Sequence, residues 1–333
     1  MTFPNWQREK WTDAPGNPLV RGFGEMRERA VQGDPQVLTP GEFDAQWHML
    51  YHGFYDEDYT PFLHHLVSND GYDWKLLSKQ QINVNPIFIF KDNGKWILYY
   101  SAALRREPGA AEKYGCVNMI RARVSDDLVN WSGDVDILAP TLPWEREHDP
   151  GQPDCVQARN PCVVKLGEGR YRLYYSAGTI LLRDCGYEEP KYIGFADGPT
   201  PLGPFVRHPA PVLAPDASIP HRNYGAGAIK VYGLGDKFLA LYNGIYLDEA
   251  GRSRSAVSLL TSGDGIKFAE APYNPIILPE GQDWKKGLVY QFDLVRFEDE
   301  LRLYYNARDG FENGIERIGC SVIKTGDPVV KLW

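Results

Sequence analysis

Long hydrophobic runs are absent from this sequence of 333 residues. No apolar stretch approaches the roughly 18–20 residues that a membrane-spanning helix needs. The first ten residues also lack the apolar core of about 7–15 residues that is typical of a secretory signal. We therefore expect neither a membrane protein nor a secreted one, and we expect a cytoplasmic location.

Cysteine is scarce, and its five residues form no Cys-x-x-Cys pair. An odd number without paired spacing argues against a disulfide framework and against a structural zinc site. Free thiols in a reducing compartment are the simpler interpretation. The five residues are Cys116, Cys155, Cys162, Cys185 and Cys320.

Several catalytic and cofactor motifs are also missing from the sequence, namely Gly-x-Ser-x-Gly, a Walker loop and His-Glu-x-x-His. The short Gly225–Gly227 segment precedes an expected strand rather than a helix, so it is not a dinucleotide loop. No dense Asp/Asn loop suggests calcium. We expect no cofactor and no metal. A net charge of -8 argues against nucleic acid as partner, because phosphates are bound by clustered Lys and Arg.

Aromatic residues, in contrast, are abundant: 20 Tyr, 9 Trp and 14 Phe. Together with 33 Gly and 25 Pro, they favour many short strands joined by turns over long helices. Much of this composition belongs to an internal repeat.

A Leu-Tyr string followed by a small or polar residue recurs five times along the chain. Before each copy lie a short apolar segment and a turn with a charged or Gly-rich tip. This order predicts a strand, a tight turn and a second strand in every unit. The copies begin at Leu50, Leu98, Leu173, Leu241 and Leu303.

A second string closes the units at 68–74, 125–131 and 262–268, with a variant at 196–205. It begins with Ser and Asp, whose side chains can cap a tight turn, and it ends on an aromatic residue that we expect to pack between neighbouring sheets. Five units of about four strands predict an all-β fold, a five-bladed β-propeller. A β-sandwich with chance similarity is the alternative.

No linker or low-complexity stretch interrupts the repeat, so we expect a single propeller domain at 31–333. Residues 1–30 are expected to form an N-terminal extension or closing segment, with a helix-like stretch at 24–30.

Five units with Ser-x-Asp-Gly closures, and Asp-Pro or Asn-Pro at inner-strand starts, resemble the five-bladed propeller glycosidases. These are glycoside hydrolase family 43, the invertase group of family 32 and the mannoside phosphorylases of family 130. The resemblance covers roughly residues 30–325. It implies a site where the five inner strands begin, with two carboxylates across the scissile bond.

At those starts, Asp34 matches the first-blade Asp that serves as general base or nucleophile in the resembling families. A strand or turn cap is the structural alternative for it. The third unit has Asn160 where family 43 has a second Asp. The fourth unit, at 223–227, has no carboxylate where the general-acid Glu is expected. The acid/base pair of these families is therefore incomplete.

Two residues are candidates for the missing acid. Asp293 lies in the fifth inner strand, on the same face as Gln291 if the strand is regular. Asp154 lies in a polar loop before the third inner strand. His148 and His52 are alternatives because imidazole titrates near neutral pH, although the place of His52 in the repeat favours packing.

Arg159 and Arg222 each lie close before an inner-strand start, where two guanidinium groups could bind a carboxylate or phosphate. Pairing with a nearby Asp is an equally good interpretation. Tyr224 could act as an acid or nucleophile only with a strongly lowered pKa. The residues that we expect to contact substrate are Asn85, Arg159, Asn160, Arg222, Tyr224 and Gln291.

The sequence therefore suggests a glycoside hydrolase-like enzyme acting on a small carbohydrate substrate, with Asp34, Asp293 and Asp154 as the catalytic candidates. A non-catalytic sugar-binding propeller and a glycoside phosphorylase or transglycosylase are the alternatives. The sugar, the stereochemical outcome and the oligomeric state stay open.

Overall fold

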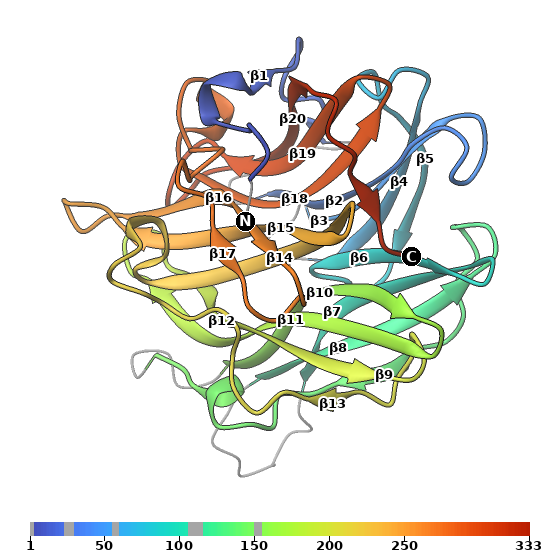
Figure 1. Ribbon diagram of the computed structural model, residues 1–333, viewed down its shortest axis with the longest axis horizontal. Coiled ribbons are helices and arrows are strands. Elements are labelled where there is room, and N and C mark those ends of the chain that lie inside the picture. Colours follow the sequence, from blue (N-terminus) through green and yellow to red (C-terminus); the bar gives the residue numbers. More distant parts are fainter. Residues whose placement is uncertain (1–2, 23–29, 55–59, 106–115, 150–154) are drawn as a thin grey trace. The chain divides into compact units, whose positions relative to one another are not determined.

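The computed structural model describes residues 3–22, 30–54, 60–105, 116–149 and 155–333. The helix-like stretch expected at 24–30 falls almost entirely outside these ranges. Within them the chain is all-β, as predicted, and every helical segment is a 3₁₀ turn of three residues (Figure 1). These turns are η1 (Arg8–Lys10), η2 (Trp144–Arg146), η3 (Pro220–Arg222) and η4 (Asp283–Lys285).

The strands form antiparallel sheets in which chain neighbours pair, as the repeat predicts. One sheet has the order β2-β3-β4-β5 and another β1-β20-β19-β18, so an N-terminal strand completes the last sheet. The bounds are β1 (Thr12–Asp13), β2 (Val31–Leu38), β3 (Trp47–Phe54), β4 (Phe62–Ser68), β5 (Lys75–Gln81), β18 (Leu288–Phe297), β19 (Glu300–Arg308) and β20 (Glu316–Lys324).

Two further strand sets are joined into one sheet by a short parallel pairing of β8 with β10. A fourth sheet has the order β17-β16-β15-β14-β21. The bounds are β6 (Ile87–Asp92), β7 (Lys95–Arg105), β8 (Cys116–Ser125), β9 (Val135–Leu138), β10 (Cys155–Gly167), β11 (Arg170–Leu182), β12 (Tyr187–Gly198), β13 (Val206–Arg207), β14 (Gly225–Leu234), β15 (Lys237–Leu247), β16 (Ser253–Ser262), β17 (Ala269–Glu270) and β21 (Val330–Lys331).

The chain divides into two compact units. Unit 1 comprises residues 1–84, 230–243 and 254–331, and unit 2 comprises residues 85–229, 244–253 and 332–333. Unit 1 holds the β2–β5 sheet and the β18–β20 sheet, and unit 2 holds the sheet of β6–β13. The single domain expected at 31–333 stays a prediction.

The closing string folds as predicted. The Ser68 hydroxyl accepts from the amides of Asp70 and Gly71 and donates to the Asp70 carboxylate at 2.9 Å. These bonds satisfy polar backbone groups of the turn. The same arrangement recurs at Ser262 and Asp264. Trp74 at the end of the first copy packs edge-on against Tyr304 of the neighbouring sheet, with ring centroids 6.1 Å apart. The expected packing of the terminal aromatic is thus confirmed there.

One polar position of the repeat ties successive sheets together. It is the residue that follows Leu-Tyr-x at Ser101, Ser176 and Asn306, but in the Leu241 copy the tie comes from Asn243, one place earlier. In each case the side chain reaches the start of the next inner strand. Ser101 Oγ on β7 donates to the Ala158 carbonyl on β10 at 3.4 Å, within unit 2. Asn243 Nδ2 on β15 donates to the Val289 carbonyl on β18 at 2.9 Å, within unit 1. The hydrogen bonds are buried, which makes each tie costly to lose.

The same position makes two more ties. Ser176 Oγ on β11 donates to the Gly227 carbonyl on β14. Asn306 on β19 accepts from the Asp34 amide on β2 at 3.3 Å, so this tie leads from the last sheet to the first. The repeat therefore encodes sheet-to-sheet contacts as well as hairpins.

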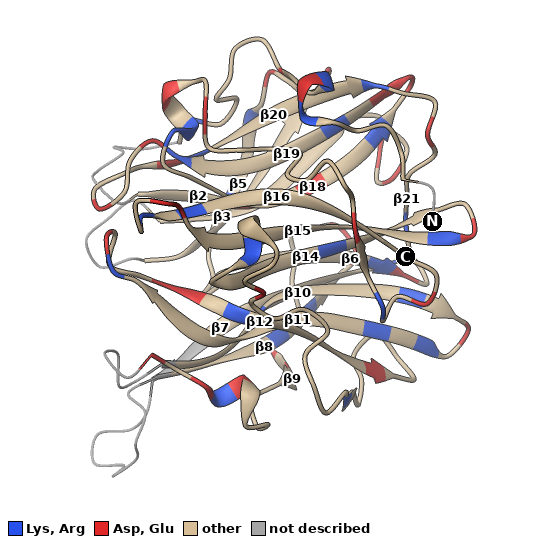
Figure 2. Cartoon of the chain, turned by 60° about the vertical axis from the view of Figure 1, so that its left-hand side comes forward, with Lys and Arg blue, Asp and Glu red and all other residues tan. Residues whose placement is uncertain are grey.

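Charged side chains of both signs are interspersed along the strands and loops (Figure 2). Within the described ranges, no helix is long and apolar enough to cross a bilayer.

Candidate active site

The inner strands begin irregularly. Antiparallel registers shift between Gly33 and Gln36 in β2, between Arg159 and Cys162 in β10, and between Val289 and Phe292 in β18. Such bulges redirect side chains out of the regular alternation of a strand, and they are frequent beside active sites. The starts that the sequence marks out therefore differ from ordinary strand ends.

Asp34 lies in the first of these bulges with a left-handed backbone, φ 56°. Few residues other than glycine adopt this conformation, and Asp is among those that tolerate it best. The side chain is buried, with 3% of the residue exposed. A left-handed, buried aspartate is held in place by its surroundings, which is a common condition of functional residues.

His52 on β3 is an ionisable side chain in contact with Asp34. Its Nδ1 lies 2.6 Å from Asp34 Oδ2, and both side chains are about 5% exposed. The contact is at ion-pair distance, although its angle departs from that of a regular hydrogen bond. Gly33 makes room for the ring, because a Cβ at that position would lie 2.6 Å from His52 Cε1. The first inner strand thus presents an aspartate–histidine pair.

Glu316 is a second buried carboxyl group in the same region. It lies at the start of β20, and its Oε2 accepts from Asn306 Nδ2 at 2.9 Å. Arg308 lies directly across the strand pair, with its Nε 3.9 Å from Glu316 Oε1. Burial, opposed by Arg308, Asn306 and His52 and reinforced by the charge of Asp34, raises the pKa of Glu316 above its ordinary value. Two buried carboxyl groups, Asp34 and Glu316, therefore flank Asn306.

Two buried histidines stand on β4, behind His52. His64 stacks on Tyr51 with ring centroids 4.5 Å apart. Burial first, and then the charges of Lys79 and His52, lower the pKa of His64 to about 3. His65 Nε2 lies 2.9 Å from His48 Nδ1, and burial lowers the pKa of His65 to about 4. Both rings are therefore neutral at physiological pH.

Asp293 on β18 is engaged by three donors. Its Oδ2 accepts from the Val37 amide at 2.8 Å and from Lys331 Nζ at 2.7 Å. Its Oδ1 accepts from the Tyr232 hydroxyl at 3.2 Å. A carboxylate group whose two oxygens are held by a lysine, a backbone amide and a tyrosine hydroxyl suits a structural anchor better than a reacting group.

Asn160 repeats the backbone of Asp34 in unit 2. It lies in the β10 bulge with φ 54° and is buried. Its amide donates to Ser176 Oγ at 3.1 Å and to the Gly227 carbonyl. Arg159 beside it is half-buried and donates to Gln157 Oε1 at 3.2 Å.

Four other expected binding residues are placed separately. Asn85 precedes β6, and its amide donates to the Ser101 carbonyl at 3.1 Å. Arg222 is buried in η3 and donates to the Ala214 carbonyl. The Tyr224 hydroxyl donates to the Leu181 carbonyl at 3.1 Å, and burial raises its pKa, the opposite of what acid or nucleophile chemistry needs. Gln291 is buried in the β18 bulge.

Asp154 falls in the segment 150–154, which lies outside the described residues. His148 is described, and its Nδ1 lies 3.4 Å from the Arg146 carbonyl.

Unit 1 thus brings Asp34 together with His52, Asn306 and Glu316. The repeat favours packing for His52, and it predicts no site role for Asn306 or Glu316. One signal was available: His and Asn occupy repeat positions where most other copies have Tyr and Ser or Gly. Glu316 carries no such signal, because it lies outside both repeated strings.

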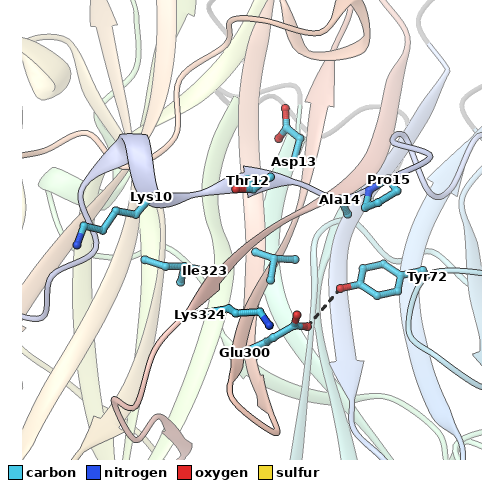
Figure 3. A pocket seen from close by; sticks show the side chains of 10 residues that line it. Lys10, Thr12, Asp13, Ala14, Pro15, Tyr72, Glu300, Ile323 and Lys324 are labelled. Atoms are coloured by element: carbon cyan, nitrogen blue, oxygen red, sulfur yellow. Dashed lines mark hydrogen bonds between the residues drawn. The ribbon is translucent and has the colours of Figure 1, made fainter.

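Unit 1 also contains two cavities. One, of about 600 Å³, is lined by β1, β20 and Tyr72, whose hydroxyl donates to Glu300 at 3.4 Å (Figure 3). The other, of about 590 Å³, is lined by Arg21, Trp284, Asp309 and Arg317 among others. Neither is lined by Asp34. Among the described residues, no cluster of three or more His, Cys, Asp or Glu is arranged to hold a metal ion.

Comparison with known proteins identifies the fold of the chain but no sequence family. No family model matches the sequence, and no curated protein matches it. Solved structures do resemble it. An N-acetylgalactosamine deacetylase from F. plautii, in complex with blood group B trisaccharide, is 14% identical with a TM-score of 0.65, covering 95% of this chain and 96% of that one.

Two glycoside hydrolases are similar as well. A putative one from Parabacteroides distasonis is 14% identical with a TM-score of 0.63, covering 94% of this chain and 96% of that one. A family 43 endo-arabinanase from Bacillus licheniformis is 14% identical with a TM-score of 0.54, covering 90% and 96%. The resemblance inferred from the sequence is therefore confirmed at the level of fold: the chain has the all-β fold of propeller-type glycoside hydrolases.

Proposed function

We propose that this chain is a glycoside hydrolase-like enzyme that cleaves or transfers a small glycoside, on a closed five-bladed propeller. The observation that carries the proposal is Asp34, a buried carboxylate with a left-handed backbone at an inner-strand start, 2.6 Å from His52. Structures that share the fold include an endo-arabinanase and a deacetylase bound to a trisaccharide, which supports a carbohydrate substrate.

Closure of the propeller is supported by the polar ties of the repeat. Each leads from a second strand to the following inner strand, and the tie from Asn306 to Asp34 runs from the last sheet to the first. The pairing of β1 with β20 adds an N-terminal strand to that last sheet. Both features suit a radial array of five blades.

In this proposal Asp34 is the general base or the nucleophile. Glycoside hydrolysis uses one carboxylate in that role and a second carboxyl group as acid. The contacts of Asp293 with Lys331, Tyr232 and the Val37 amide favour an anchoring role for it. Asp154, from the polar loop before β10, is therefore the acid that we propose.

Substrate contacts are proposed for Asn85, Arg159, Asn160, Arg222, Tyr224 and Gln291, all at or beside inner-strand starts. Arg159 donates to the neutral side chain of Gln157, which supports a role in binding an anionic sugar or phosphate.

The test is turnover of a panel of aryl glycosides, arabinosides and galactosides included, by the wild-type chain and by Asp34→Asn. We expect turnover in the wild type and its loss in the variant, with sugar binding retained. Asp154→Asn should lose activity on poor leaving groups, and Asp293→Asn should keep the rate. Undiminished turnover by Asp34→Asn would overturn the assignment.

A non-catalytic sugar-binding protein is the second candidate. It is favoured by Asn160, whose amide is bonded to Ser176 and Gly227 where a carboxylate would stand in family 43. Binding of a sugar by calorimetry without turnover of any aryl glycoside would select it. Turnover that requires inorganic phosphate would instead select a phosphorylase.

A further inference from the structure

Asp34 is held by two contacts. His52 contacts its carboxylate, and a second residue contacts its backbone amide. That second residue is Asn306, whose Oδ1 accepts from the Asp34 amide at 3.3 Å. The same Asn306 side chain donates from Nδ2 to Glu316 Oε2 at 2.9 Å. Its two ends are thereby oriented, since an amide that accepts at one end and donates at the other cannot flip without losing both bonds. Asn306 is a bridge between Asp34 and Glu316.

Glu316 is also tied to the segment that leads into Asp34. Its backbone amide donates to the Ala30 carbonyl at 2.9 Å, just before β2 begins. The backbone amide of Glu316 therefore contacts Ala30, just before β2, and its carboxyl group contacts Asn306, which accepts from the Asp34 amide. An aspartate with φ 56° persists only where its surroundings hold it.

The geometry points to Glu316 as a positioning residue that acts through Asn306 to set the conformation and the charge of Asp34. This inference rests on the proposed function, in which Asp34 is the reacting carboxylate. It adds to the candidate site a residue from β20, a strand that contains no inner-strand start.

The charged and titratable groups that face Glu316 come from three strands. They are Asp34 on β2, His52 on β3 and Arg308 on β19, and His64 on β4 lies beyond His52. Two adjacent buried carboxyl groups do not both ionise easily. Burial first, and also the charge of Asp34, raise the pKa of Glu316. Where the pH is high enough to ionise Glu316, a second negative charge forms beside Asp34, and we expect the reaction to slow.

Two substitutions at Glu316 separate geometry from charge. Glu316→Gln keeps an oxygen that accepts from Asn306 and stays neutral at every pH, whereas Glu316→Ala removes the acceptor. We expect Glu316→Gln to keep kcat within about threefold at neutral pH and to lose the alkaline limb of the pH profile. Glu316→Ala should lower kcat by about tenfold or more. If Glu316→Gln falls as far as Glu316→Ala, an ionised Glu316 is required and the proposal is wrong.

A matched control exists in the preceding repeat. Asn243, one place earlier in its Leu-Tyr string, is as buried as Asn306, and its Nδ2 donates to the Val289 carbonyl on β18. Asn306→Ala and Asn243→Ala should lower the melting temperature similarly, since each removes a buried tie. Only Asn306→Ala should lower kcat, by about tenfold. An equal loss of kcat in both variants would mean that the Asn306 hydrogen bonds act only on stability, and it would overturn the proposal.

One readout is independent of activity. The His52 ring reports on its neighbours by NMR, and its signal is identified as the one lost in His52→Gln. We expect the His52 ring resonance at a fixed pH to shift in Asp34→Asn, Glu316→Gln and Asn306→Ala, and to stay in place in Asn243→Ala. A shift in Asp34→Asn alone would overturn the inference. Unimpaired turnover in Asp34→Asn would overturn the proposed function instead.

Discussion

Asp34 and Asn160 adopt the same backbone conformation, a bulged left-handed corner at an inner-strand start, but carry different side chains. Each lies in a bulge, precedes a proline, is buried and has a left-handed φ, 56° in unit 1 and 54° in unit 2. Asp34 turns its carboxylate to a histidine, and Asn160 turns its amide to a hydroxyl and a carbonyl. The corner itself is therefore architecture, and the side chain that it carries decides whether it offers chemistry or a structural tie.

The largest effect expected from this comparison is on activity. Asp34→Asn gives the first corner the side chain of the second, and we expect kcat to fall about 1000-fold or more because the reacting carboxylate is gone. The fold should survive, since Asn tolerates the left-handed region well. Kinetics on an aryl glycoside together with circular dichroism measure both. A fall of less than tenfold would break the contrast between the corners.

The reverse change should act on stability. In Asn160→Asp a carboxylate meets the Gly227 carbonyl and loses the donations that Asn160 makes. We expect a loss of about 2 kcal/mol in the free energy of unfolding, because buried acceptors are left opposed. Urea denaturation of Asn160→Asp beside Asp34→Asn measures the difference. Equal free energies of unfolding for the two variants would contradict a stabilising role for the Asn160 hydrogen bonds.

The two corners should also respond differently to acid. The pKa values of His64 and His65 are lowered to about 3 and about 4, from an ordinary value of 6.5. Stability from these neutral rings is fully present above pH 6.5, declines progressively as the pH falls below it, and is gone once the pH is below the folded values. Hydrogen exchange at pH 7 and pH 5 should therefore show β3 and β4 losing protection before β10 and β11. His65→Gln should reduce this acid sensitivity, and simultaneous loss in both regions would contradict it.

The smallest effect is expected at Ser176. Its hydroxyl donates to the Gly227 carbonyl and accepts from Asn160, so Ser176→Ala removes one member of the second corner. We expect a cost of about 1 kcal/mol in the free energy of unfolding and no change in kcat. Chemical denaturation and steady-state kinetics check the two parts. A change in kcat would indicate that the second corner takes part in the reaction.

The sequence predicted the all-β class and its hairpins well because both depend on local patterns. Hairpins around each Leu-Tyr string and turns capped by Ser68 or Ser262 depend on residues close in the chain, so pattern reasoning finds them. The position of Asp34 followed from the same repeat. Its bulge was not predicted, because register irregularities depend on the partner strand.

The surroundings of Asp34 were harder to predict. Asn306 and Glu316 reach it from strands some 270 residues away in sequence, and no local pattern links such positions. His52 looked like a packing residue because its neighbours in the repeat are aromatic core. Asp293 looked available for chemistry because its donors, Tyr232 and Lys331, come from β14 and β21. Long-range partners decide roles that residue type alone leaves open.

The short strand β1 has a consequence for synthesis of the chain. Asp13 accepts from the Ser321 hydroxyl at 2.8 Å, 308 residues later in sequence. At about 5–20 residues per second, the first strand waits roughly 15–60 s for its partner to be made. Trp6 and Trp11 pack in a cluster whose other members include residues from 232 to 329, so they too lack many of their partners during that interval. The sheet that β1 joins can thus be completed only after β20 at 316–324 has been made, and its folding depends on an early segment that stays unengaged until then.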